Sequence, residues 1–117
     1  MMLPSILAER RSGNEIVLEL ALTEDLDVFQ GHFPSMPVLP GVAQIDWAWR
    51  LGKRQGLIGP AAELRDFQVK FRNIIQPSIP LALTLRRESA RQRIGFNYHS
   101  GQRLMSSGHL NIQTEAS

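Results

Sequence analysis

The sequence predicts an α+β fold in which one long helix is wrapped by a curved antiparallel β-sheet. The first observation is a strongly apolar helical segment near the middle of the chain, over residues 40–55. The second is the run of alternating apolar segments that follows it, separated by turn residues. A chain of 117 residues is the size of one domain. We therefore expect a single domain over residues 1–117.

The helix is predicted to begin at Pro40 or Gly41, because proline is tolerated in a first helical turn. Gly56 is a typical C-terminal stop, and cationic side chains crowd the last turns, where they complement the helix dipole. The apolar residues of this segment point in nearly every direction: Val42, Ala43, Ile45, Trp47, Ala48, Trp49 and Leu51. This pattern is typical of a helix buried on all sides.

Four segments after the helix are predicted to be strands, over residues 64–75, 79–87, 92–98 and 103–113. The clearest period-two alternation runs from Phe67 to Arg72. Turn residues separate the segments at 76–78, 88–90 and 100–102. Before the helix we predict strands around 6–11 and at 15–23, with a turn at 12–14, and a long ordered loop over 24–39.

Composition excludes several classes of site. The chain has no cysteine, so it has no disulfide, no thiolate nucleophile and no zinc–cysteine centre. No run approaches the roughly 18 apolar residues that a membrane helix needs, and the first residues do not resemble a signal peptide. His99 and His109 lack metal-like spacing and are interpreted as surface or strand histidines. We expect a cytoplasmic protein without metal or cofactor.

Charge is unevenly distributed along the chain. Residues 1–62 contain 5 basic and 7 acidic side chains and residues 63–117 contain 8 and 4, so the segments carry −2 and +4 and sum to +2. Two interpretations are open for the basic second half. It is either a solvated, arginine-rich sheet face or a surface that attracts a polyanion or an acidic protein.

His32 is the first candidate catalytic residue. It lies in a segment whose backbone is restricted by Pro34, Pro37 and Pro40. Histidine titrates nearest to neutral pH, which suits proton abstraction or donation. The alternative is a loop histidine that only hydrogen-bonds a backbone carbonyl.

Asp46 is the second candidate, a carboxylate between Ile45 and Trp47 on the apolar helix. An unpaired carboxylate in an apolar interior costs several kcal/mol. Asp46 therefore either belongs to a functional site with a protonatable group or pairs with a nearby arginine or backbone donor.

The amides of Gly41 and Val42 are the third element, because N–H groups in a first helical turn lack intrahelical partners. They point along the positive end of the helix dipole and suit an oxygen that gains negative charge during a reaction. The alternative is an ordinary helix start.

The motif Gly31-His32-Phe33-Pro34, followed by Pro37, Pro40-Gly41-Val42 and Asp46, resembles the (3R)-hydroxyacyl-acyl-carrier-protein dehydratases of the FabZ and FabA type. The string from Pro37 to Ala48 is most similar to the stand-alone ApeI-like dehydratases of that group. The resemblance covers roughly residues 15–113 and implies the hotdog fold, a long helix wrapped by an antiparallel sheet.

The resemblance implies a role for each matched residue. His32 would remove the C2 proton of a 3-hydroxyacyl thioester, and Asp46, supplied by a partner subunit, would help the 3-hydroxyl leave as water. Gly41 would bind the thioester carbonyl through its amide, and Val42, Phe33 and Pro40 would complete the substrate-binding site.

The expected function is dehydration of 3-hydroxyacyl thioesters of acyl carrier protein or coenzyme A to trans-2-enoyl thioesters, in fatty acid or aryl-polyene lipid synthesis. The expected assembly is a homodimer or a dimer-based oligomer that binds no nucleic acid. Two alternatives stay open: a hotdog acyl thioesterase and a non-catalytic acyl-binding subunit.

Overall fold

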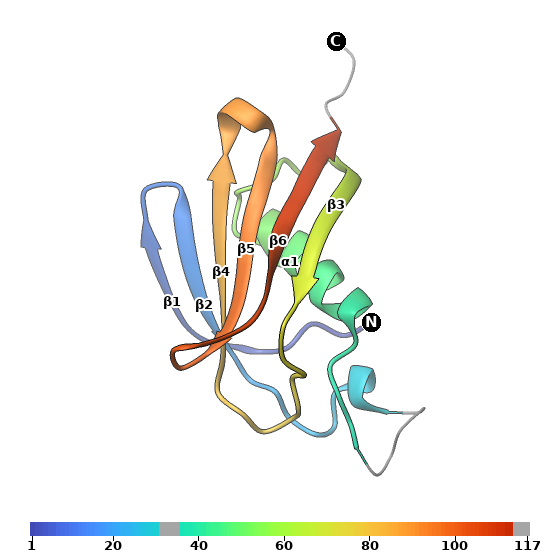
Figure 1. Cartoon of the computed structure of the whole chain (residues 1–117). Helices are drawn as coiled ribbons and strands as arrows, with labels where there is room; N and C mark the ends of the chain where they lie inside the picture. The colour runs from blue at the N-terminus through green and yellow to red at the C-terminus, as the bar shows by residue number, and fades with distance from the viewer. Residues whose placement is uncertain (31–35, 114–117) are drawn as a thin grey trace.

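The computed structural model describes residues 1–30 and 36–113, which form one helix and a six-stranded sheet. The helix is α1 (Gly41–Arg54). The strands are β1 (Ile6–Ser12), β2 (Glu15–Leu20), β3 (Glu63–Phe71), β4 (Leu81–Glu88), β5 (Arg93–Ser100) and β6 (Arg103–Gln113). Short 3-10 turns, η1 (Asp27–Phe29) and η2 (Ser89–Arg91), precede the helix and join β4 to β5. The predicted α+β hotdog architecture is confirmed (Figure 1).

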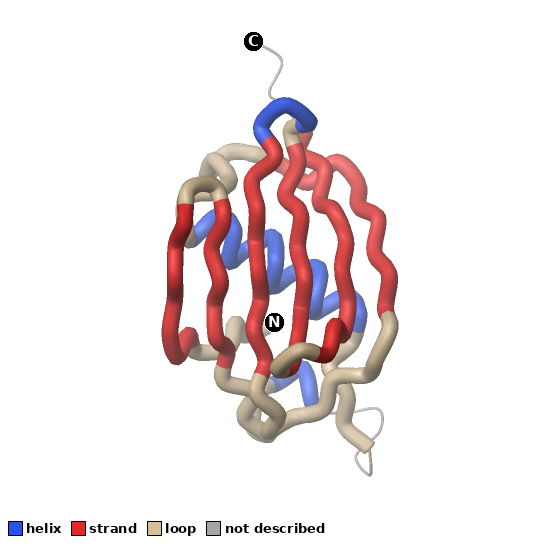
Figure 2. The backbone as a smooth tube through the Cα atoms, turned by 60° about the vertical axis from the view of Figure 1, so that its left-hand side comes forward, coloured by secondary structure: helices blue, strands red, loops and turns tan. Residues whose placement is uncertain are grey.

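All neighbouring strands of the sheet are antiparallel, in the order β1-β2-β4-β5-β6-β3. The sheet curves around α1, which crosses one of its faces (Figure 2). β3 follows the helix in sequence but pairs with the last strand, β6, so it becomes one edge of the sheet. The helix N-terminus and this edge therefore lie on the same side of the molecule (Figure 1).

The two faces of the sheet differ in polarity, as period-two alternation requires. In β5, Ile94, Phe96 and Tyr98 are buried toward the helix, whereas the residues between them are only half-buried. The strand register places Gly95 between Arg86 on β4 and His109 on β6. We call the side that carries these residues the outer face; it is rich in polar and charged side chains.

Strand boundaries differ from the predictions mainly in β3. The predicted strand over 64–75 ends at Phe71, because the amides of Arg72 and Asn73 both donate to the Met105 carbonyl, at 2.9 and 3.1 Å. The Asn73 side chain then donates to Leu104 O at 2.8 Å. The backbone thus leaves the regular β3–β6 ladder and turns toward the helix N-terminus.

The prediction that α1 is buried on all sides is wrong for the single chain. One face packs into the core through six buried residues: Ala43, Gln44, Trp47, Ala48, Leu51 and Gly52. Val42 keeps 65% of its surface exposed, and Ile45, Asp46 and Trp49 are half-buried. The helix is therefore buried on one face, and it keeps a partly apolar flank that the sheet of its own chain does not cover.

Candidate active site

The helix begins where a tethered extended segment meets Pro40. The Leu39 amide donates to Ile75 O at 2.7 Å, and Pro40 is the N-cap with an extended backbone. The amides of Ala43 and Gln44 both return to Pro40 O, at 3.1 Å each. Within the part of the chain that the structure describes, the Gly41 and Val42 amides donate to no carbonyl. These two donors are available to a ligand.

A pocket of about 360 Å³ lies beside this helix start. Residues before and in the helix and residues after β3 line it: Val38, Leu39, Pro40, Gly41, Gln44, Phe71, Arg72, Asn73 and Ile74. Its walls are mostly apolar, which is the usual character of a small-molecule site. The predicted substrate-binding residues Pro40 and Gly41 are both in its lining, whereas Val42 is not.

Gly41 allows the Phe71 ring to pack against the helix start. A Cβ atom at position 41 would lie 2.6 Å from the Phe71 Cζ atom, which is closer than real side chains approach. The absence of a side chain lets the aromatic ring lie directly over the first helical turn. Phe71 is thus a wall of the pocket and lies against Gly41, whose amide has no backbone acceptor among the described residues.

Gln44 anchors the pocket from behind. Its side chain donates to Leu39 O at 3.2 Å and accepts from the Ser106 hydroxyl at 2.6 Å, and both side chains are buried. The Tyr98 hydroxyl donates to the Gln44 backbone carbonyl at 2.7 Å. This network ties the helix start to β5 and β6. This network was not predicted from the sequence, although a glutamine three residues after Gly41 on an apolar helix is a signal that a buried polar partner exists.

Tyr98 stays protonated over a wide pH range. Complete burial raises the pKa of its hydroxyl well above the ordinary value of 10.0, and the negative charge of Asp46 raises it further. The hydroxyl therefore acts as a permanent hydrogen-bond donor to the helix. This makes Tyr98 a structural support of the site and not a proton donor at neutral pH.

The Asp46 carboxylate has a charged partner and is only partly buried in the single chain. Its side chain is 32% exposed, and its Oδ2 accepts a hydrogen bond from Arg50 Nη1 at 3.1 Å. The pair has i,i+4 spacing on the open flank of α1. The arginine partner considered from the sequence is therefore present, and the predicted role of Asp46 in a reaction stays a prediction.

The first residues of the chain lie against the same helix. Arg50 Nη1 also donates to Met1 O at 2.6 Å, and Trp47 Nε1 donates to Met2 O at 3.0 Å. The Met2 amide reaches the carboxylate of Asp27 in η1 at 3.1 Å. This N-terminal segment thereby connects the Asp46 partner to the segment that precedes residue 31.

The predicted site residues are distributed as follows. Pro40, Gly41, Val42 and Asp46 all belong to α1 or its cap. His32 and Phe33 lie outside the described residues, so their predicted roles stay predictions. Among the described residues there is no group of three side chains that could hold a metal ion, and no helix long and apolar enough to cross a membrane.

Comparison with known proteins places the chain in a family. A solved structure from Xenorhabdus doucetiae, the dehydratase heterocomplex ApeI:P, superposes with a TM-score of 0.87 at 31% identity, covering 97% of this chain and 100% of that one. The 3-hydroxyacyl-(acyl-carrier-protein) dehydratase FabZ of Oenococcus oeni is 29% identical over 101 residues, 81% of this chain and 73% of that protein. The FabZ protein of Lactiplantibacillus plantarum is 32% identical over 93 residues, 74% of this chain and 63% of its own length.

The family profile described as ApeI-like, ApeI dehydratase, matches residues 8–109. The match includes β2 to β5, the helix start with its free amides, and Asp46. On this evidence the chain belongs to the ApeI-like dehydratase family.

Proposed function

We propose that this protein removes water from 3-hydroxyacyl thioesters, carried by acyl carrier protein or coenzyme A, to give trans-2-enoyl thioesters in lipid synthesis. The observation that carries the proposal is the family match over residues 8–109, which includes the helix start with its two free amides. The names of the FabZ relatives give the reaction and the carrier for those proteins. A cytoplasmic location belongs to the proposal and fits a chain without cysteine.

The proposed chemistry is an elimination with three assigned groups. His32 takes the proton from C2, the electrons of the C2–H bond form the C2=C3 double bond, and the C3–O bond breaks. The Asp46 carboxyl group donates a proton to the hydroxyl, which leaves as water. The Gly41 amide donates to the thioester oxygen, which gains negative charge as the C2 proton departs. Each positioned acid–base group of this kind is worth about 100-fold to 10,000-fold in rate.

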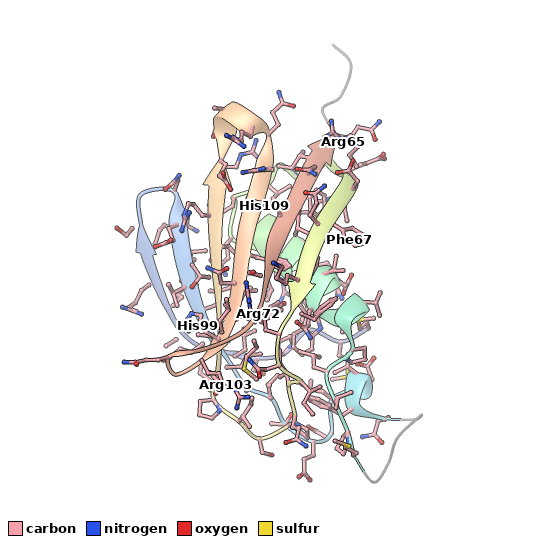
Figure 3. All side chains as sticks on the ribbon, viewed as in Figure 1. Arg65, Phe67, Arg72, His99, Arg103 and His109 are labelled. Atoms are coloured by element: carbon pink, nitrogen blue, oxygen red, sulfur yellow. The ribbon has the colours of Figure 1, made fainter. Side chains whose placement is uncertain are left out.

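The proposal includes a homodimer. Four large apolar side chains stay exposed around the β3 edge and the start of α1: Val42 at 65%, Phe67 at 48%, Phe71 at 52% and Ile74 at 57%. β3 has a free hydrogen-bonding edge, and Figure 3 shows Phe67 on this strand at the rim of the sheet. Several exposed apolar side chains near an open strand edge are typical of an interface. A second copy on this patch would bring another Asp46 close to the first chain's pocket.

The reaction is tested by incubating the protein with 3-hydroxyacyl thioesters of several chain lengths and following enoyl absorbance. We expect His32→Ala and Asp46→Asn each to lower turnover about 100-fold or more, with an unchanged fold by circular dichroism. Unchanged rates in both variants would refute the assignment. Release of free thiol from acyl-coenzyme A by the parent protein would favour the thioesterase alternative.

Mixing the two inactive variants tests whether the site is shared between subunits. In a heterodimer of His32→Ala with Asp46→Asn, one site would hold an intact His32 and Asp46 and the other neither. After random exchange of subunits, turnover should recover to about a quarter of the parent value. No recovery, with subunit exchange verified by mass spectrometry, would place both groups in one chain. A protein that stays monomeric at all concentrations would refute the homodimer. Because the solved relative is described as a heterocomplex, association with a different chain is then the outcome to test.

A further inference from the structure

A second hollow lies on the outer face of the sheet, away from α1. It is an open groove of about 440 Å³ that crosses β4, β5, β6 and β3. We call it the outer groove. It is lined by Gln68, Val69, Lys70, Arg72, Thr84, Arg86, Glu88, Gly95, Phe96, Asn97, Ser107, Gly108 and His109. In Figure 3 the labelled Arg72 and His109 lie over the face of the sheet that is turned to the viewer.

The floor of the groove is kept open by Gly95. A Cβ atom there would lie 3.0 Å from Glu88 Oε2 and 3.7 Å from His109 Cδ2. The neighbouring outward side chains, Thr84, Asn97 and Ser107, are small and carry hydrogen-bonding groups. The groove therefore offers hydrogen-bonding groups as well as charges to an occupant.

The charges of the groove are unbalanced. Its single carboxylate, Glu88, is engaged by Arg93 at 3.1 Å and by His109 at 3.5 Å. Arg86 is paired with Glu15 at 3.3 Å. Lys70 and Arg72 form no ion pair with any residue that the structure describes, and both are exposed. Positive charge thus accumulates at the β3 end of the groove.

Arg72 connects the groove to the candidate active site. It lines the outer groove and also the pocket beside Gly41. The cationic end of the groove is therefore the end nearest the helix start. An anionic molecule held there would have its attached chain beside the pocket in which the thioester would react.

We propose that the outer groove docks the acidic surface of the carrier protein that delivers the acyl thioester. The inference rests on the proposed function and adds the surface that selects the carrier. Complementary charge supports it, because the unpaired cations lie beside the site and the polar floor offers donors to carboxylates. Lys70 and Arg86 lie outside the pocket lining and hold the carrier; the Arg86–Glu15 pair is exposed and therefore weak, so it does not prevent this. Arg72 lies where the carrier's arm passes into the pocket.

The test compares one acyl chain on two carriers. The parent and the double variant Lys70→Glu/Arg86→Glu are assayed with a 3-hydroxyacyl thioester of holo acyl carrier protein and with the same thioester of pantetheine. We expect kcat/KM for the carrier substrate to fall on the order of tenfold or more, mainly through KM, and kcat/KM for the pantetheine substrate to stay within about twofold.

A matched control separates local docking from overall charge. Arg54→Glu/Arg91→Glu makes the same change in net charge at two exposed positions outside the groove, at the end of α1 and in η2. We expect it to leave both substrates within about twofold of the parent. Light scattering on all three proteins checks that the oligomeric state is unchanged.

Equal losses in the groove variant and the control, or no selective loss in the groove variant, would overturn the inference. If the parent converts neither substrate, the proposed function fails, and calorimetric titration with holo carrier still tests the groove. Binding that weakens with salt and is lost only in the groove variant supports docking. Carrier binding that is unaffected in that variant, or tighter binding of duplex DNA than of the carrier, would overturn it.

Discussion

Replacing Gln44 by leucine should destabilise the protein far more than the same substitution at an exposed polar position of a helix. The substitution leaves two buried groups without partners: the Ser106 hydroxyl, which donates to Gln44 Oε1 at 2.6 Å, and the Leu39 carbonyl, which accepts from Nε2 at 3.2 Å. Each orphaned group costs about 1–3 kcal/mol. Burying leucine in place of an amide offsets part of this, so we expect the free energy of unfolding to fall by about 2–4 kcal/mol.

A double-mutant cycle assigns that loss to the hydrogen bonds. Ser106→Ala alone should cost about 1–2 kcal/mol, since it leaves Gln44 Oε1 unpaired. The double variant removes both partners of one bond and should cost about 1–2 kcal/mol less than the sum of the single changes. Urea unfolding of all four proteins at one concentration measures these quantities. A loss below about 0.5 kcal/mol for Gln44→Leu, or strict additivity, would refute the reasoning.

Three further predictions concern packing and charge. Gly41→Ala should displace the exposed Phe71 ring. We expect the free energy of unfolding to stay within about 1 kcal/mol of the parent and the dehydration rate to fall on the order of tenfold. An unchanged rate would mean that the ring does not shape the pocket. The hydrogen bond from Arg93 holds the pKa of Glu88 below its ordinary value of 4.5. The parent should therefore be more stable than Glu88→Gln above pH 4.5, and this advantage should disappear as the pH falls through the lowered pKa. A difference in urea midpoint that does not depend on pH would contradict this. Burial raises the pKa of Tyr98, the single tyrosine, so tyrosinate absorbance should appear only together with unfolding in alkali, and its appearance in the folded protein would refute the assignment.

The elements of the fold were predictable because their signals are local. Alternation from Phe67 onward, the Pro40–Gly41 start and the turn glycines at 13, 56 and 101 help to identify one helix and the succession of strands along the chain. The end of β3 was less predictable, since the sequence stays apolar through Ile75. The strand ends at Phe71 because two successive amides share one carbonyl of β6, which no sequence period reveals.

The residues of the candidate site that lie on the helix could be predicted from the sequence, but the hydrogen bonds that hold the helix in place could not. Gly41 and Asp46 were found from the helix pattern, and the Arg50 partner follows i,i+4 spacing, a signal that was present in the sequence. The Gln44 network could not be predicted in the same way. It depends on Ser106 and Tyr98, which are more than fifty residues away and meet the helix only once the sheet has formed.

The error about the helix carries the most information about assembly. An all-round apolar pattern predicted burial on every side, yet the chain's own sheet covers a single face of α1 and leaves Val42 largely exposed. The uncovered flank continues onto Phe67 and Phe71 at the free edge of β3. Exposed apolar surface favours association, so this flank supports the proposed homodimer. Under the proposed homodimer, the apolar pattern on this helix reflects the assembled protein, and Asp46 lies on the flank proposed to meet the second chain.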